Sequence, residues 1–256
     1  DPRNLGVLDT TGVITKSSNI GTSMIVQKLD NRYFHDFLAR MGYGRSTGSG
    51  FPGEASGLLL PADRWSGTHK QTMSYGYGLS ATPLQIARSY ATIANHGRAV
   101  QPTLVKGQQG ESQQVMSPEI ADTVLRMMQT VTEPGGTAVQ AAIPGYHVAG
   151  KTGTARKASG GGYSRRYVSF FAGVVPVENP RFAMAVVIDD PDPAKGIYGG
   201  QVSAPVFQSV MDGALRLMDV PPDDIETWLA EQARQQAKER TRTATRTAAG
   251  PAGGAP

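Results

Sequence analysis

The sequence predicts a mixed α/β (α+β) fold in which helices flank a sheet. Three strands are expected in succession, at about residues 147–157, 167–175 and 181–189. In the third strand, large apolar residues alternate with smaller ones, which is typical of a largely buried strand. Helical patterns precede the strands, and the apolar segment 204–218 predicts a last helix that packs on the sheet.

The first third of the chain predicts short helices followed by loops. Residues 8–16 and 20–29 are interpreted as two short helices. Residues 31–41 predict a third helix, since four large apolar residues share one face and a glycine follows. Residues 42–73 contain many Gly, Pro and Ser, so we expect loops there.

The middle of the chain predicts two helices with clear start signals. Thr82 is typical of an N-cap, Pro83 suits the first turn, and Gly97 ends the helix. Ser117, followed by proline and glutamate, opens the next helix. Its apolar face is expected to consist of Ile120, Val124, Met127, Met128 and Val131.

The C-terminal segment, residues 223–256, has a different composition. We expect a polar helix over residues 226–240. Residues 241–256 are Thr, Ala, Arg, Gly and Pro, too few of them apolar to repay the entropy lost on ordering, and predict a disordered tail. The chain is therefore divided into residues 1–222 and this segment.

Composition is ordinary for a globular domain and excludes several classes of protein. The 256 residues are 39% hydrophobic and contain no cysteine, which excludes disulfides and cysteine metal sites. A net charge of +4 is too small and scattered to indicate nucleic-acid binding. No apolar run reaches the roughly 18 residues of a membrane helix. The four histidines are not spaced as metal ligands and are interpreted as structural.

Lys151 lies among small residues in the segment Val148–Ala155. Gly153 within a strand often marks the close approach of a ligand or another backbone. Thr152 and Thr154, two residues apart, project from one face of a strand. The segment therefore suits a carboxylate and a peptide-like substrate added to the sheet edge. An ordinary Lys-Thr-Gly turn is the alternative.

The segment Lys16–Asn19 precedes an apolar run and has two interpretations. Ser and Asn at the start of a helix are typical capping residues. A Ser-x-Asn pattern upstream of Lys-Thr-Gly also matches two of three short motifs that serine-acylating enzymes use, the third being Ser-x-x-Lys.

Longer segments accompany these motifs in one order: Thr47–Glu54, Ser74–Ser80, Thr82–Gln85, Ala149–Lys157, Phe170–Gly173 and Gly199–Phe207. With them, residues 1–222 resemble the C-terminal part of the transpeptidase domain of class B penicillin-binding proteins, of the division-specific penicillin-binding protein 3 type. The resemblance implies the fold shared with serine β-lactamases, an antiparallel sheet flanked by helices, here incomplete at the N-terminus.

The activity that the resemblance implies is that of a serine-type peptidoglycan D,D-transpeptidase. Such enzymes cross-link stem peptides at the division septum through a serine acyl-enzyme and are the targets of β-lactams. Because this chain contains no Ser-x-x-Lys, we expect the nucleophile motif upstream of Asp1 and no acylation by the chain alone. A D,D-carboxypeptidase or β-lactamase-type hydrolase, and a non-catalytic penicillin-sensing or scaffold module, are the alternatives.

The resemblance also implies roles for individual residues. Ser17 would relay a proton, Asn19 would hold the substrate amide, Lys151 would shape the electrostatics, and the Thr154 N–H would be an oxyanion donor. The expected catalytic residues are Ser17, Asn19 and Lys151. The expected substrate-binding residues are Thr152, Gly153, Thr154, Arg156, Tyr77, Tyr167 and Tyr198. For Arg156 and the tyrosines, a solvated surface position or an ordinary core or turn position is the alternative.

The expected partners follow from the same resemblance. They are a peptidoglycan stem peptide ending in D-Ala-D-Ala, β-lactam antibiotics, and divisome membrane proteins including a SEDS-type glycan polymerase, with no cofactor, no metal and no nucleic acid. The family places this domain in the periplasm of a bacterium, held at the inner membrane by an anchor outside this chain.

Overall fold

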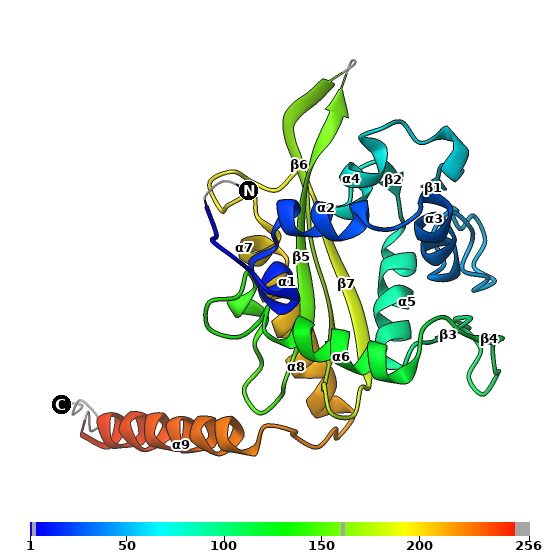
Figure 1. Cartoon of the computed structure of the whole chain (residues 1–256). Coiled ribbons are helices and arrows are strands. Elements are labelled where there is room, and N and C mark those ends of the chain that lie inside the picture. The colour runs from blue at the N-terminus through cyan, green and yellow to red at the C-terminus, as the bar shows by residue number, and fades with distance from the viewer. Residues whose placement is uncertain (2–3, 160–161, 249–256) are drawn as a thin grey trace.

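The computed structural model describes residues 1, 4–159 and 162–248 and centres on a three-stranded antiparallel sheet (Figure 1). Its strands are β5 (Ala149–Ser159), β6 (Gly162–Val175) and β7 (Phe182–Asp189), in the order β5-β6-β7. The three predicted strands are thereby confirmed, although β5 and β6 form a longer hairpin than expected, with a register shift between Arg156 and Ala158.

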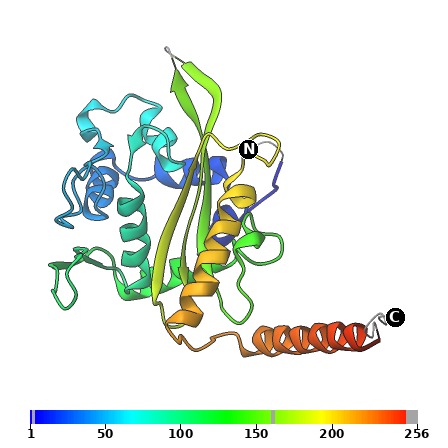
Figure 2. The ribbon, with the colours of Figure 1, turned by 180° about the vertical axis from the view of Figure 1, so that it is seen from behind.

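Helices cover both faces of this sheet. α8 (Ala204–Leu217) covers one face and lies in front of the sheet in Figure 2. On this face Phe207 of α8 packs against Phe171 of β6. α5 (Pro83–Ala94) and α6 (Pro118–Gln129) contact the opposite face. Because strand side chains alternate in direction, neighbouring residues of β6 supply two separate core layers.

The expected helices begin close to their predicted starts. The Thr82 hydroxyl accepts from the Gln85 N–H, the Gln85 side chain accepts from the Thr82 N–H, and this capping box opens α5. Ser117 likewise caps α6. Of the expected apolar face, Met128 and Val131 are buried and Val124 packs against the core, but Ile120 is exposed, and Ala121 and Leu125 are buried in its place. The N-terminal helices are α1 (Thr10–Lys16), α2 (Asn19–Gln27) and α3 (Asn31–Arg40).

The segment that was expected to be rich in loops also contains short regular elements. α4 (His69–Ser74) begins within it. β1 (Leu58–Leu59) pairs with β2 (Leu79–Ser80), although about 20 residues separate the two strands in the sequence. A second short ladder joins β3 (Arg98–Val100) to β4 (Ser112–Gln114). The remaining elements are η1 (Ala62–Arg64), η2 (Val139–Ala141) and α7 (Gly199–Val202). Such short strands carry too few residues to show a two-residue period.

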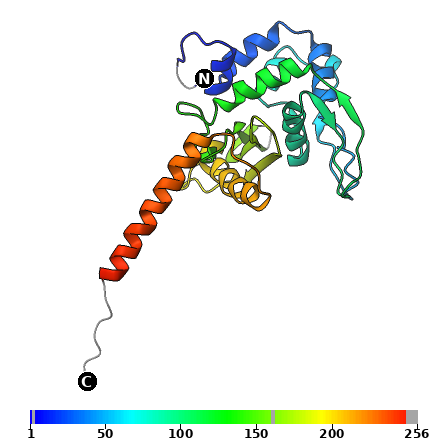
Figure 3. The ribbon, with the colours of Figure 1, turned by 90° about the horizontal axis from the view of Figure 1, so that it is seen from below.

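The C-terminal helix is longer than predicted. α9 (Ile225–Ala248) projects from the body and continues through Thr241, where a disordered tail was expected (Figure 3). Ala and Arg are good helix formers, and each residue added to an existing helix gains one hydrogen bond, so the composition does not end it. Only residues 249–256 of the expected tail lie outside the described residues.

α9 is attached to the body at its first turn. The Asp224 N–H donates to the Gly145 carbonyl, the Gly145 N–H donates to the Thr227 hydroxyl, and the Trp228 ring packs over Gly145. The predicted boundary near residue 222 remains a proposal. Across the described residues, no helix combines the length and apolar character needed to cross a membrane.

One further difference concerns β7, which was expected to be largely buried. Most of its side chains are half-buried, and Val187 is 38% exposed. β7 is one of the two edge strands of the sheet, so its burial comes mainly from the helices packed on its faces.

Candidate active site

Ser17 and Lys151 meet beside the outer edge of β5. The Lys151 ammonium donates a hydrogen bond to the Ser17 hydroxyl, with 2.6 Å between Nζ and Oγ. Ser17 is the C-cap of α1 in the left-handed conformation (φ 57°, ψ 49°), which turns the chain sharply between α1 and α2. This turn brings the hydroxyl to a lysine 134 residues away.

The two adjacent serines have different tasks. Ser18 is the N-cap of α2: its hydroxyl accepts from the Gly21 N–H at 3.0 Å and is buried. The capping interpretation is confirmed for Ser18, and this cap leaves Ser17 available to Lys151. The catalytic interpretation of Ser17 stays a prediction. Asn19, the first residue of α2, is exposed, and its backbone N–H donates to the Asp1 carboxylate at 2.8 Å.

The environment of Lys151 weakens its hold on its proton. Burial lowers the pKa of Lys151 to about 8, because the charged form loses hydration. Its ammonium also donates to the Thr152 carbonyl at 3.2 Å. A lysine that is charged at neutral pH yet titrates near 8 is able to stabilise negative charge and to exchange a proton with Ser17.

The outer edge of β5 has backbone groups that β6 does not use. The Arg156 N–H donates to the Tyr77 hydroxyl at 3.2 Å, so it points away from β6. Hydrogen-bonding direction alternates along an antiparallel strand, and no register shift lies between Thr152 and Arg156. The N–H groups of Thr152 and Thr154 therefore also point to the outer edge, on the side where a substrate strand would pair.

The Thr152 and Thr154 hydroxyls face two residues that the motifs did not predict. Thr152 Oγ1 lies 3.1 Å from Thr137 Oγ1, and Thr154 Oγ1 accepts from the Gly199 N–H at 3.2 Å. Thr137 follows a glycine pair, which is too common a pattern to identify it. Gly199 opens one of the segments that carry the family resemblance but was not expected as a site residue.

Gly153 is required by a side chain of the protein itself. It pairs with Phe170 of β6, and a Cβ at Gly153 would lie 1.9 Å from the Phe170 ring. The predicted close approach at this glycine is thus made by an aromatic ring across the strand pair.

The remaining predicted residues are divided between the site and the surface. The Arg156 guanidinium lies over the Tyr167 ring, 6.0 Å from its centroid, and these residues are cross-strand partners. With Tyr77 on the Arg156 N–H, three predicted residues meet at this end of β5. Tyr198 is 60% exposed at the start of α7, next to Gly199, and is linked to the site only through that neighbour.

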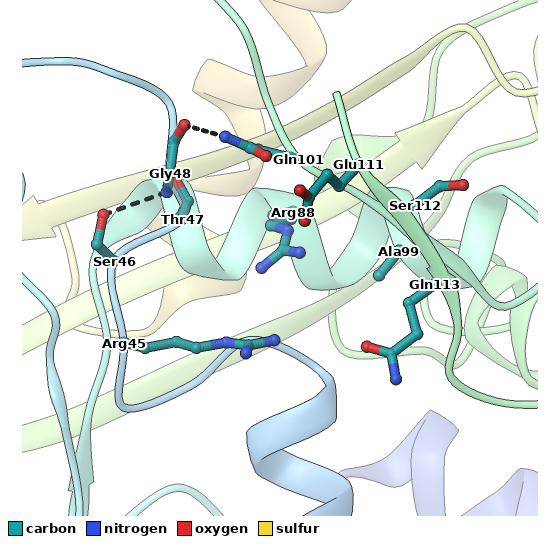
Figure 4. A pocket seen from close by; sticks show the side chains of 10 residues that line it. All are labelled: Arg45, Ser46, Thr47, Gly48, Arg88, Ala99, Gln101, Glu111, Ser112 and Gln113. Carbon is teal, nitrogen blue, oxygen red and sulfur yellow. Dashed lines mark hydrogen bonds between the residues drawn. The ribbon is translucent and has the colours of Figure 1, made fainter. Parts of the chain in front are cut away.

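A pocket of about 290 Å³ lies apart from this site, between the loop after α3 and the β3–β4 ladder (Figure 4). Arg45 and Arg88 extend into it, and Gln101 donates to the Gly48 carbonyl. It shares no residue with the Ser17–Lys151 pair. The adjoining loop folds around Glu54, whose carboxylate accepts from the Thr47 N–H and from the Ser46 and Ser49 hydroxyls. Hydrogen bonding within this loop lowers the pKa of Glu54 to about 2.

The histidines and acidic groups do not gather into a site. In the described ranges, no three His, Cys, Asp or Glu side chains are close enough to hold a metal ion. His96 pairs with Asp122 at 2.8 Å on the surface.

Comparison with known proteins gives consistent matches. Residues 1–212 match the penicillin binding protein transpeptidase domain. The chain is 45% identical to the peptidoglycan D,D-transpeptidase FtsI of Escherichia coli K12, over 86% of this chain and 38% of that protein. It is 42% identical to the probable peptidoglycan D,D-transpeptidase PbpC of Pseudomonas aeruginosa, over 90% of this chain and 41% of that protein.

Solved structures agree with these relatives. The transpeptidase domain of Burkholderia pseudomallei penicillin-binding protein 3 superposes with a TM-score of 0.82 at 40% identity, over 87% of this chain and 68% of that one. Penicillin-binding protein 3 of Mycobacterium tuberculosis, crystallised with aztreonam, gives 0.77 at 35% identity, over 83% of this chain and 52% of that one. The chain spans less than half the length of the two curated relatives named above.

Proposed function

The chain belongs to the transpeptidase domain family of penicillin-binding proteins, and on that premise we propose that it supplies the second and third catalytic motifs of a peptidoglycan D,D-transpeptidase. The contact between Lys151 Nζ and Ser17 Oγ carries the proposal, because it joins the two motifs in one proton-exchanging pair. The nucleophile is the serine of a Ser-x-x-Lys motif, which this chain does not contain.

In the proposed acylation, the serine oxygen attacks the carbonyl carbon of the penultimate D-Ala of a stem peptide. The carbonyl oxygen becomes negative in the tetrahedral intermediate, and the Thr154 N–H on the outer edge of β5 donates to it. The attacking serine gives its proton to the lysine of its own Ser-x-x-Lys motif. The C–N bond then breaks, the Ser17 hydroxyl passes a proton to the departing amine, and Lys151 restores the proton of Ser17. The proton taken from the attacking serine replaces the one that Lys151 gives up, so the amine gains one proton and the serine loses one. Asn19 holds the substrate amide. An acceptor amine next replaces the serine and forms the cross-link.

The terminal carboxylate of the stem peptide is assigned to the threonine hydroxyls. Thr154 Oγ1 accepts from the Gly199 N–H, so its own proton remains available to donate to a carboxylate. Thr152 has the same freedom when Thr137 is the donor of their shared hydrogen bond. Lys151 and Arg156 add positive charge on this side of β5, which favours a substrate that ends in a carboxylate.

The same groups suit β-lactams, which carry a carboxylate beside a reactive amide. The aztreonam complex of the Mycobacterium tuberculosis relative supports this assignment. We assign the domain to the periplasm, held at the inner membrane by an anchor outside this chain, with divisome membrane proteins, including a SEDS-type polymerase, as its partners. The similarity to the peptidoglycan D,D-transpeptidase FtsI supports these assignments.

The test uses the protein that carries this chain together with a Ser-x-x-Lys segment. We expect a fluorescent penicillin to label it covalently, and a D-Ala-D-Ala peptide with an acceptor amine to yield mainly the cross-linked product and free D-Ala. Release of the acid alone would favour the carboxypeptidase alternative. Absence of labelling with an intact fold would refute the proposal.

A further inference from the structure

Gln85 is a buried side chain outside the site whose amide nitrogen and oxygen are both hydrogen-bonded. Only 1% of its surface is exposed. Its amide nitrogen donates to the carbonyls of Arg45 at 2.7 Å, Ser56 at 2.9 Å and Gly42 at 3.3 Å. Its amide oxygen accepts from the Thr82 N–H at 2.8 Å. This set fixes the orientation of the amide, because a reversed amide would set its nitrogen against an N–H donor.

These contacts close one end of the β1–β2 ladder. Ser56 lies two residues before β1, and Thr82 lies two residues after β2. The ladder itself has only two residue pairs, Leu58 with Ser80 and Leu59 with Leu79. A strand pair this short is marginal alone, so the side chain that joins its two ends decides whether it keeps its register.

The other end of the ladder leads to the site. Tyr77 lies two residues before β2, and its hydroxyl accepts from the Arg156 N–H on the outer edge of β5. Arg156 is two residues from Thr154, whose N–H is the proposed oxyanion donor. A shift of β2 along β1 would therefore move the Tyr77 hydroxyl relative to the edge at which the substrate binds.

We propose that Gln85 is a positioning residue for the reaction, which sets the place of Tyr77 through the β1–β2 ladder and thereby the geometry of the β5 edge. This inference deepens the proposed function and rests on it. The Gln85 amide bonds to carbonyls of Gly42, Arg45 and Ser56 and not to Ser17 or Lys151, so the proposed route from Gln85 to the site runs through Tyr77.

The test is a double-mutant cycle of Gln85→Met with Tyr77→Phe, in the protein that carries this chain with a Ser-x-x-Lys segment. Methionine has a similar length and no hydrogen-bonding amide. Each single variant should slow acylation by a fluorescent penicillin about two- to tenfold, as expected for loss of one neutral hydrogen bond at the edge. In the Tyr77→Phe background, Gln85→Met should add less than about twofold, since its route to the site is already cut.

Gln114→Met is the matched control. The Gln114 amide also donates to two carbonyls, those of His96 and Met116, but it lies on β4. Its effect should be small and the same in both backgrounds. A second readout is hydrogen exchange at the Arg156 amide, which both Tyr77→Phe and Gln85→Met should accelerate and Gln114→Met should not.

If Gln85→Met does not fold, Gly57→Ala replaces it in the double-mutant cycle, because Gly57 lies next to β1 and close to the Gln85 amide. Gly57 has φ +64°, and its added Cβ would lie 2.4 Å from the Ser80 carbonyl oxygen and 2.9 Å from Gln85 Oε1. Equal effects of these substitutions with and without the Tyr77 hydroxyl, or unchanged exchange at Arg156, would overturn the inference. An unlabelled wild-type protein would instead overturn the proposed function.

Discussion

The layer between the sheet and α8 and the outer edge of β5 belong to one sheet but use opposite chemistry. In the layer, Phe171 and Phe207 are fully buried and meet edge to face, with 4.9 Å between ring centroids. At the edge, a lysine ammonium rests on a serine hydroxyl and backbone N–H groups point outward. The layer removes apolar surface from water, whereas the edge holds a charged group that is partly shielded from water.

The difference shows how the protein sustains a costly site. Burial lowers the pKa of Lys151, which means that the folded protein pays for its charge at neutral pH. The apolar layer offsets this cost, since each large side chain buried there stabilises the fold by about 1.5–3 kcal/mol. Changes in the layer should therefore alter stability, and changes at the edge should alter acylation.

The largest expected effect is that of Phe171→Ala. Removing a fully buried ring leaves a cavity and should lower the free energy of unfolding by about 3–5 kcal/mol. Urea unfolding of the protein that carries this chain measures it. Val187→Ala on β7, where the side chain is 38% exposed, should cost less than about 1.5 kcal/mol. Equal losses would contradict the separation of layer and surface.

At the edge, Lys151→Ala should slow acylation by a fluorescent penicillin roughly ten- to hundred-fold. A charge-assisted hydrogen bond contributes about 1.5–3 kcal/mol, and about 1.4 kcal/mol is a factor of ten. Lys151→Arg should restore only part of the rate, because its planar fork does not reproduce a compact charge. Lys157→Ala is the control, since the Lys157 ammonium pairs with the carboxylate of Asp189, the last residue of β7, at 2.7 Å and not with Ser17. Equal rates for Lys151→Ala and wild type would remove Lys151 from the site.

The pH dependence of stability should report the same lysine. Burial lowers the pKa of Lys151 from its usual 10.5 to about 8, so between these values the unfolded chain binds more protons. The free energy of unfolding should then rise with pH across this window, relative to Lys151→Met, by on the order of 1–3 kcal/mol. Below pH 8 the difference should be constant. Parallel curves from pH 7 to 10 would show that Lys151 is not desolvated.

The smallest expected effect sharpens the comparison by using one substitution in two places. A Cβ added at Gly213, within α8, meets nothing within 4 Å, so Gly213→Ala should stabilise the protein by about 0.5–1 kcal/mol. Gly153→Ala at the edge should destabilise it, because its Cβ would collide with the Phe170 ring. Thermal unfolding of both variants measures the two signs, and a loss of stability in Gly213→Ala would argue against the packing of α8 described above.

Local signals predicted the helices well and the short ladders poorly. The Thr82 and Ser117 caps act within four residues, so the sequence shows them directly. The β1–β2 pair joins segments about 20 residues apart with two pairs, and nothing local marks it. For the C-terminal helix, the predicted length was too short. The composition suggested disorder beyond residue 240, whereas an existing helix extends through any residues that tolerate the helical conformation.

Within the site, the motifs located Ser17, Lys151 and the threonines but not their partners. The sequence does not show which of two adjacent serines caps α2, since both suit that position. The left-handed conformation of Ser17 decides it. Thr137 and Gly199 remained hidden because their partners on β5 lie 15 and 45 residues away.

The sequence by itself determined the family, the order of the strands and the starts of the helices, because these depend on motifs and on hydrogen bonds between near neighbours. Only the tertiary structure decided that Ser17 meets Lys151 across 134 residues and that Tyr77 meets Arg156 across 79. Such contacts depend on how helices and strands pack as whole elements. No local pattern encodes that packing, since it follows from the shape and burial of every side chain between the two residues.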